Sequence, residues 1–379
     1  MEERKEMNRE KSTRKQLKKA EKFIENLKEN TKILIVAHSD GDGIISAAIT
    51  TQAIQEQKKE LKIKHLFILS RGKEAKDKII EKMKKKKVNT VIFLDYTPND
   101  KQVYKEIEKQ GARTLTIDHH PIKNPFKTQQ EREKHVYVNP QEKGTPPSAS
   151  VLCHLLYEEM DGEKNTKPWA MIGAHSDTRM KQSRTLLNLT QEEKELYIPN
   201  ESLHRTLVDI SNVLLSAYLD IDLAEEEYKY IKKSIEQENP VLIQEEKYRG
   251  TKRLYETMEK AEREKIRETK ENPHIEKYEE SKLIVVPIKS KLRIKSKVAE
   301  QLRLKYPDYI IAVKMEKEER CLLSIRGNNT DLNRVIPKAC EGIEAQGGGH
   351  PNAAGAAINK KHYPKFIENL KKQLKDEVR

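Results

Sequence analysis

The sequence predicts an α/β protein of two domains, each built around its own sheet. The chain has 379 residues, which is enough for two hydrophobic cores. Short apolar runs alternate with helical patterns from residue 32 to residue 118, and a second alternation begins at Leu283. A highly charged helical stretch, interrupted by Pro240 and Gly250, separates the two. The expected parts are a basic N-terminal helix over residues 1–30, a first domain over 31–223, a helical connector over 224–280 and a smaller second domain over 281–379.

The first domain is predicted to contain a parallel sheet. The pattern predicts strands at residues 33–37, 65–69, 88–95 and 112–118, with helices at 44–57, 76–85 and 101–110 between them. Strands that alternate with helices of this length are joined by right-handed crossovers, which makes the sheet parallel. Further helical or buried segments are expected at 151–160, 168–173 and 203–223. Ligands of open α/β sheets bind at the carboxyl ends of the strands, so side chains at these ends should converge.

Acidic and histidine side chains stand at those strand ends. Uncompensated carboxylates repel one another in one crevice, so we expect a cation among them. The set consists of His38, Asp40, Asp42, Asp95, Asp118, His119, His120 and Asp177. Carboxylate and imidazole ligands without thiolate suit Mn²⁺ or Mg²⁺ better than structural zinc. Because there are more ligands than one ion needs, we expect a two-metal site that hydrolyses a phosphate ester or anhydride.

The second domain adds a glycine-rich stretch at residues 346–357, which we interpret as a loop. The pattern predicts strands at 283–288, 309–315 and 321–326 and helices at 295–305, 332–340 and 363–374. Consecutive glycines let backbone N–H groups face an anion. Gly347, Gly348 and Gly349 can therefore form a phosphate nest, with His350 as a further donor.

The composition favours a folded, basic protein of a reducing compartment. Hydrophobic residues make up 35% and charged residues 36%, but the apolar residues are concentrated in short runs, which argues against global disorder. The net charge of +13 indicates nucleic acid as a partner, although a solvated Lys/Glu-rich surface explains it equally well. Three widely spaced cysteines without a CxxC pair predict a cytoplasmic protein. Since no apolar run is long enough for a span or a signal peptide, no membrane partner is expected.

Four motifs in the first domain resemble, in order, those of the DHH phosphoesterase superfamily. They are HSDGDG at 38–43, LDYTP at 94–98, DHHP at 118–121 and SDT at 176–178. GGGH at 347–350, followed by NAAG at 352–355, resembles the signature of the DHH-associated C-terminal domain. An H-x-D-x-D-G opening followed by this domain is most similar to RecJ-like nucleases and their archaeal relatives. A compact archaeal-like form is expected, because the chain is too short for the additional nucleic-acid-binding module of bacterial RecJ.

The resemblance implies a role for each site residue. Two Mn²⁺ ions, with Mg²⁺ as the alternative, would share Asp95: one is bound by His38, Asp40 and Asp95, the other by Asp42, Asp95, His119 and Asp177. Asp118 would orient the neighbouring histidines, and His120 would contact the scissile phosphate or the leaving oxygen. Arg326 and the glycine-rich stretch resemble the family's substrate-phosphate clamp, although Gly327 stands where the family commonly has serine. The two domains are expected to close around the substrate.

The function predicted from the sequence is that of a metal-dependent phosphodiesterase, a RecJ-like exonuclease on single-stranded DNA or RNA. One alternative is a phosphodiesterase of short oligonucleotides or cyclic dinucleotides. Another is a replisome scaffold that binds a partner such as GINS, but the four intact motifs argue against a purely structural role. Two basic stretches, 84–87 and 289–297, are candidates for contacts with backbone phosphates, and solvated charged faces are the alternative for both.

Overall fold

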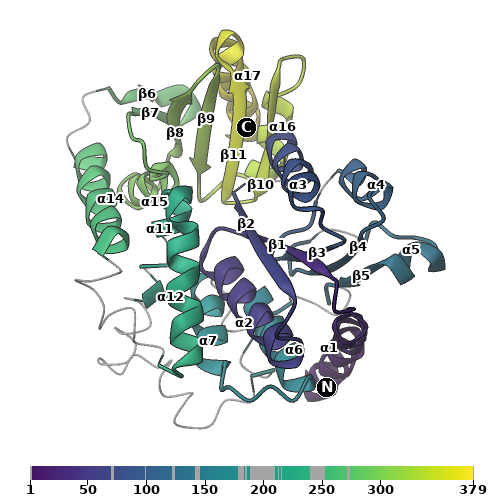
Figure 1. Ribbon diagram of the computed structural model, residues 1–379. Helices are drawn as coiled ribbons and strands as arrows, with labels where there is room; N and C mark the ends of the chain where they lie inside the picture. The colour runs from purple at the N-terminus through teal and green to yellow at the C-terminus, as the bar shows by residue number, and fades with distance from the viewer. Residues whose placement is uncertain are drawn as a thin grey trace. The chain divides into compact units, whose positions relative to one another are not determined.

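The computed structural model shows two compact units, Met1–Met258 and Glu259–Arg379 (Figure 1). The structure describes residues 2–69, 72–98, 100–121, 124–140, 146–177, 183, 186–187, 210–211, 213–214, 216–239, 252–270 and 274–378. Residues 203–209, 212 and 215 of the helix expected at 203–223 and part of the expected connector lie outside the described residues. Among the described helices, none is both long enough and apolar enough to cross a membrane.

The first unit is built on a parallel five-stranded sheet with the strand order β2-β1-β3-β4-β5. Its strands are β1 (Lys32–His38), β2 (Lys62–Ile68), β3 (Thr90–Leu94), β4 (Arg113–Ile117) and β5 (His135–Val138). The predicted α/β class with a parallel first sheet is confirmed. The short edge strand β5 was not expected from the sequence, because HVYV offers only four residues and two of them are partly exposed.

Helices pack on both faces of this sheet because the strand residues alternate between two cores. On β1, Ile33, Ile35 and Ala37 belong to one core, and Leu34 and Val36 belong to the other. The helices are α1 (Glu2–Glu25), α2 (Gly41–Gln57), α3 (Lys73–Lys86), α4 (Lys101–Lys109), α5 (Gln129–Lys134), α6 (Ala149–Glu159), α7 (Lys167–Ser176), α11 (Ser216–Leu219) and α12 (Ala224–Glu236), with a 3₁₀ turn at Ile221–Leu223. The first core includes residues of α1, α2, α6 and α7, whereas α3 and α4 contribute to the second. Helix α2 is buried from Gly41 to Ile54, since it contacts β1, α6, α7 and α12.

The second unit contains a mixed six-stranded sheet with the order β10-β11-β9-β8-β7-β6. Its strands are β6 (Glu276–Tyr278), β7 (Leu283–Ile288), β8 (Ile310–Lys317), β9 (Arg320–Arg326), β10 (Ala345–His350) and β11 (Ala353–Asn359). Its helices are α14 (Lys252–Lys270, continuous across the division between the units), α15 (Lys295–Lys305), α16 (Leu332–Ala339) and α17 (Tyr363–Val378), with 3₁₀ turns at Glu279–Ser281 and Lys360–His362. Helices α16 and α17 share a core with alternate residues of the sheet.

The interpretation of the glycine-rich stretch as a loop is wrong. Gly347, Gly348 and Gly349 lie in β10, which pairs antiparallel with β11. The cause is the close approach of the two strands. A Cβ atom on Gly349 would lie 2.3 Å from the Ala353 carbonyl oxygen, so the glycines serve strand pairing as well as backbone exposure.

Candidate metal centre

The turn from β1 into α2 brings three of the predicted side chains to one end of the first sheet. His38 ends β1, Asp40 caps α2 and Asp42 lies in the first turn of that helix. The Asp40 side chain accepts a hydrogen bond of 3.1 Å from the Gly43 N–H, as an N-cap residue does. A Cβ atom at position 43 would lie 2.2 Å from the His38 carbonyl oxygen, so only glycine fits this tight turn.

Asp95 lies at the centre of the cluster, directly after β3. Its side chain is 1% exposed, and its φ of 51° places a non-glycine residue in the left-handed region. Asp95 Oδ1 lies 3.0 Å from His119 Nε2 and 3.5 Å from His120 Nδ1, whereas Oδ2 lies 3.6 Å from His38 Nδ1. The two oxygens of one carboxylate therefore face two different groups of side chains.

Asp42 is held by the first turn of α6. The Ala149 N–H donates to Asp42 Oδ2 at 2.8 Å, and the Ser150 N–H donates to Oδ1 at 2.9 Å. Helix N-terminal N–H groups stabilise a carboxylate in this way. Sequence analysis missed these donors, although Ser148 after two prolines is a recognisable N-cap signal.

Two more of the predicted residues complete this side of the cluster. His119 Nε2 lies 3.3 Å from Asp177 Oδ2, which follows α7, and 3.8 Å from Asp42 Oδ2. Helix α7 approaches closely, since a Cβ atom at Gly173 would lie 2.3 Å from Ser150 Oγ and 3.1 Å from Asp42 Oδ1. Helix α7 thus packs closely against the start of α6, which holds Asp42.

Asp118 organises the segment after β4. Its Oδ1 accepts the His119 N–H at 2.7 Å and the His120 N–H at 3.2 Å, and it lies 2.7 Å from His120 Nδ1. Thr97 Oγ1 donates to its Oδ2 at 2.6 Å. Asn139 Nδ2 also fixes this segment by donating to the His120 carbonyl oxygen at 2.9 Å. Thr97 and Asn139 had not been singled out from the sequence.

The carboxylates crowd negative charge into a largely buried space. Burial raises the pKa of Asp95 well above its usual value, and the charges of Asp40, Asp42, Asp118 and Asp177 raise it further. Burial also raises the pKa of Asp42, against the opposing effect of its hydrogen bonds at Ser150. Burial opposes the ionised form of Asp40 too, but the His38 imidazole 2.7 Å away outweighs it and lowers the pKa of Asp40.

A divalent cation fits this donor set. Three overlapping groups place one ligand atom per residue within 4.8 Å of one another: His38, Asp40 and Asp95; Asp42, His119 and Asp177; and Asp95, Asp118, His119 and His120. Oxygen and imidazole nitrogen donors suit Mn²⁺ and Mg²⁺. A cation among them would also relieve the repulsion that raises the pKa of Asp95.

The predicted phosphate-binding residues of the second unit share one end of its sheet. His350 pairs with Ala353 across β10 and β11, and Ala353 pairs with Arg326 across β11 and β9. Directly opposite residues project from the same face, so the His350 and Arg326 side chains lie on one face, with Cα atoms about 10 Å apart. Strand β10 is the edge of the sheet, which leaves the N–H groups on its outer side available for an anion.

Comparison with known proteins identifies both units. Residues 32–174 match the family model described as the DHH family, N-terminal domain, and residues 281–376 match the DHHA1 domain. An uncharacterized protein of Methanocaldococcus jannaschii is 27% identical over 219 residues, which cover 55% of this chain and 46% of that protein. The chain thus matches about half the length of this curated relative.

Solved RecJ structures share the fold. RecJ from Thermus thermophilus in complex with Mn²⁺ aligns with a TM-score of 0.68 and 16% identity, over 95% of this chain and 55% of that one. A second exonuclease RecJ, bound to manganese, aligns with a TM-score of 0.67 and 16% identity, over 96% of both chains.

Proposed function

The chain belongs to the DHH superfamily, whose members are phosphoesterases, and we propose that it degrades single-stranded DNA or RNA from an end, using bound divalent metal ions. The observation that carries the proposal is the position of Asp95, a buried carboxylate whose two oxygens face two groups of ligands. The basic charge of the chain and its structural likeness to RecJ support nucleic acid as the substrate.

The proposed ligands divide into two sets that share Asp95. His38, Asp40 and Asp95 hold one ion, and Asp42, Asp95, His119 and Asp177 hold the other, with Mn²⁺ as the expected ion and Mg²⁺ as the alternative. When bound, the pair supplies a hydroxide nucleophile at neutral pH and neutralises charge on the phosphoryl oxygens. We assign Asp118 to the orientation of the neighbouring histidines, because its oxygens already accept hydrogen bonds from Thr97 and from two backbone N–H groups.

His120 is proposed to act on the substrate. Its Nδ1 lies 2.7 Å from Asp118 Oδ1, which holds the ring in one orientation and directs Nε2 away from that carboxylate. The ring is only partly buried, so a substrate can reach it. A protonated His120 can therefore donate from Nε2 to the leaving oxygen or to a phosphate oxygen. Arg326, His350 and the Gly347, Gly348 and Gly349 stretch, through those of its N–H groups that face away from β11, are proposed to bind a substrate phosphate.

Two predictions from the sequence concern other activities. Hydrolysis of short oligonucleotides or cyclic dinucleotides would use the same metal ligands. The two activities are therefore distinguished by the length of the substrate that is hydrolysed. The scaffold alternative with a replisome partner such as GINS requires no ligands. The assembled carboxylate cluster therefore favours catalysis over a purely structural role.

The test compares Asp95→Asn with wild type on end-labelled DNA and RNA strands and on a dinucleotide, each with Mn²⁺. Loss of a bridging ligand should reduce turnover by more than the roughly 10–100-fold that an outer partner of a metal ligand contributes. Asp100→Asn is the matched control, because Asp100 is exposed and asparagine keeps its cap of α4. Full activity of Asp95→Asn would refute the assignment, and turnover of the dinucleotide alone would favour the short-substrate alternative.

A further inference from the structure

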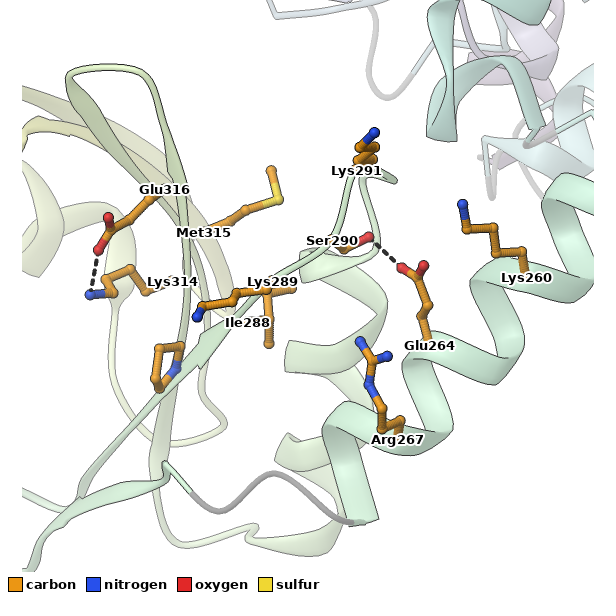
Figure 2. Close-up of a pocket in the computed structure, with 11 residues that line it drawn as sticks. Lys260, Glu264, Arg267, Ile288, Lys289, Ser290, Lys291, Lys314, Met315 and Glu316 are labelled. Carbon is orange, nitrogen blue, oxygen red and sulfur yellow. Dashed lines mark hydrogen bonds and ion pairs between the residues drawn. The ribbon is translucent and has the colours of Figure 1, made fainter.

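A basic groove lies on the second unit, between α14 and the sheet (Figure 2). It encloses about 620 Å³, within the range of ligand-binding pockets. Pro287, Ile288 and Met315 form its apolar part. In Figure 2, Glu264 and Arg267 project from α14 toward the loop that carries Ser290, and Ser290 Oγ donates to Glu264 Oε2 at 2.5 Å across the groove.

Basic side chains outnumber acidic ones around this groove. The basic residues are Lys260, Arg267, Lys289, Lys291 and Lys314, and the acidic residues are Glu264 and Glu316. Both acids are engaged locally, Glu264 by Ser290 and Glu316 by Lys314 at 3.0 Å. Within the described part of the chain, no ion pair involves Lys260, Lys289 or Lys291. The groove therefore has uncompensated positive charge on both of its sides.

The groove is separate from the proposed phosphate-binding residues of the same unit. Arg326 pairs with Ile311 at one end of β8, whereas Ile288 pairs with Met315 four residues further along that strand. Four residues of a strand correspond to about 13 Å. A phosphate held by Arg326 would thus not occupy the groove, and a ligand of the groove needs its own explanation.

The charge arrangement fits a chain of phosphates better than a single anion. Lys260 and Arg267, which also pairs with Glu268 at 2.8 Å, lie seven residues apart on α14, about 10.5 Å along the helix axis, so the positive charge extends along the groove. Lys289 and Lys291 also line the groove, from the segment that follows β7. The described lining contains no aromatic side chain on which a base could stack, which points to contacts with the backbone rather than with the bases.

We propose that this groove binds the sugar-phosphate backbone of single-stranded nucleic acid at a second position, independent of the glycine strand. The apolar part contacts the sugars and the lysines neutralise successive phosphates. This inference rests on the proposed function for the identity of the ligand, and it makes long strands the preferred substrates.

The test measures binding of a labelled deoxythymidine strand of about 20 nucleotides to the full chain in EDTA, where no hydrolysis occurs, over a range of salt concentrations. Lys289→Ala with Lys291→Ala should weaken binding about tenfold at low salt and reduce the slope of log affinity against log salt by about 1.4, since each phosphate contact on a single strand contributes about 0.7. The control is Lys338→Ala with Lys372→Ala, which removes two exposed lysines elsewhere on the unit and should retain wild-type binding.

Unchanged binding by the groove variant, or an equal loss in the control, would overturn the proposal. Displacement of the strand by an unlabelled glutamate polymer as readily as by unlabelled nucleic acid would overturn the assignment to nucleic acid. Hydrolysis of a dinucleotide with Mn²⁺ should be the same in the groove variant and in wild type, because that substrate does not need the groove. If the wild type hydrolyses no nucleic acid, the proposed function fails. The binding comparison still shows whether the groove binds single-stranded nucleic acid.

Discussion

At the scale of single residues, Asp118 is the carboxylate to which we assign the orientation of His120 rather than metal binding. Asp118→Asn keeps an acceptor for the backbone N–H groups but removes the charge beside His120 Nδ1. We expect kcat to fall about 10–100-fold, while Mn²⁺ affinity measured by calorimetric titration stays near wild type. Thr97→Val, which loses only the hydrogen bond to Oδ2, should have a smaller effect on kcat. Wild-type turnover by Asp118→Asn would show that this carboxylate does not orient His120.

A second residue, Glu227 on α12, predicts how stability depends on pH. Its carboxyl group is fully buried and accepts hydrogen bonds from Ser216 Oγ and the Ala217 N–H, both at 3.0 Å. Burial raises the pKa of Glu227 well above its usual value. A folded-state pKa above the unfolded value gives stability that is present below the unfolded pKa and is lost as pH rises through the folded pKa.

Glu227→Gln removes this titration and keeps an acceptor for both donors. The difference in Tm between the variant and wild type should therefore become more positive from about pH 5 to about pH 8 in thermal unfolding. Glu225→Gln, an exposed neighbour on the same helix, should show a constant difference. If the Glu227→Gln difference is equally constant, the buried carboxyl group does not titrate as proposed.

At the scale of elements, the first turn of α6 links helix capping to the candidate metal centre. Ser148→Ala removes the cap at Val151 and should reduce the free energy of unfolding by about 1 kcal/mol. Because Ala149 and Ser150 hold Asp42, the same change should weaken Mn²⁺ binding in a titration. The control is Thr128→Ala, which removes the cap of α5 and leaves Asp42 and its partners unaltered. Equal Mn²⁺ affinity of the two variants would contradict this link.

Buried strands were predictable because a short run of apolar, β-branched residues favours a strand and is stable only when it is buried. Strands β1, β3 and β4 occupy the runs expected for them, and the burial of every residue except those at the ends of β1 and the start of β4 explains why. Strand β10 was mistaken for a loop because glycine has a low strand propensity. Its partner β11 is rich in alanine and glycine, so the two backbones approach more closely than larger side chains would allow.

At the scale of the whole molecule, the acids and histidines that cluster were predictable, because carboxyl ends of parallel strands meet at one edge of a sheet. Asp40, Asp95 and Asp118 follow three neighbouring strands. Their supporting groups were not predictable in the same way. Asn139 acts from a segment after an unexpected strand, and the donors to Asp42 are backbone N–H groups, which carry no residue signature.

Because the two units have separate cores, we expect them to unfold in separate transitions. All proposed metal ligands belong to the first unit, whereas the second unit has its own core around Phe366. Since a ligand stabilises only the part that binds it, Mn²⁺ at about 100 times its Kd should add about 2.7 kcal/mol to the first unit. Calorimetry should then show one transition that rises by several degrees with Mn²⁺ and another that does not.

Phe366→Ala identifies the transition of the second unit, because it removes a fully buried ring. It should reduce the free energy of unfolding of that unit alone by about 3–5 kcal/mol. Ile92→Ala in the first core is the matched substitution, with a cost of about 2–5 kcal/mol in the transition that responds to Mn²⁺. A single transition that Mn²⁺ raises as a whole would mean that the units unfold together. Such coupling would transmit metal binding at Asp95 to β10, the strand proposed to bind phosphate, whereas two transitions confine the effect of the ions to the unit that holds them.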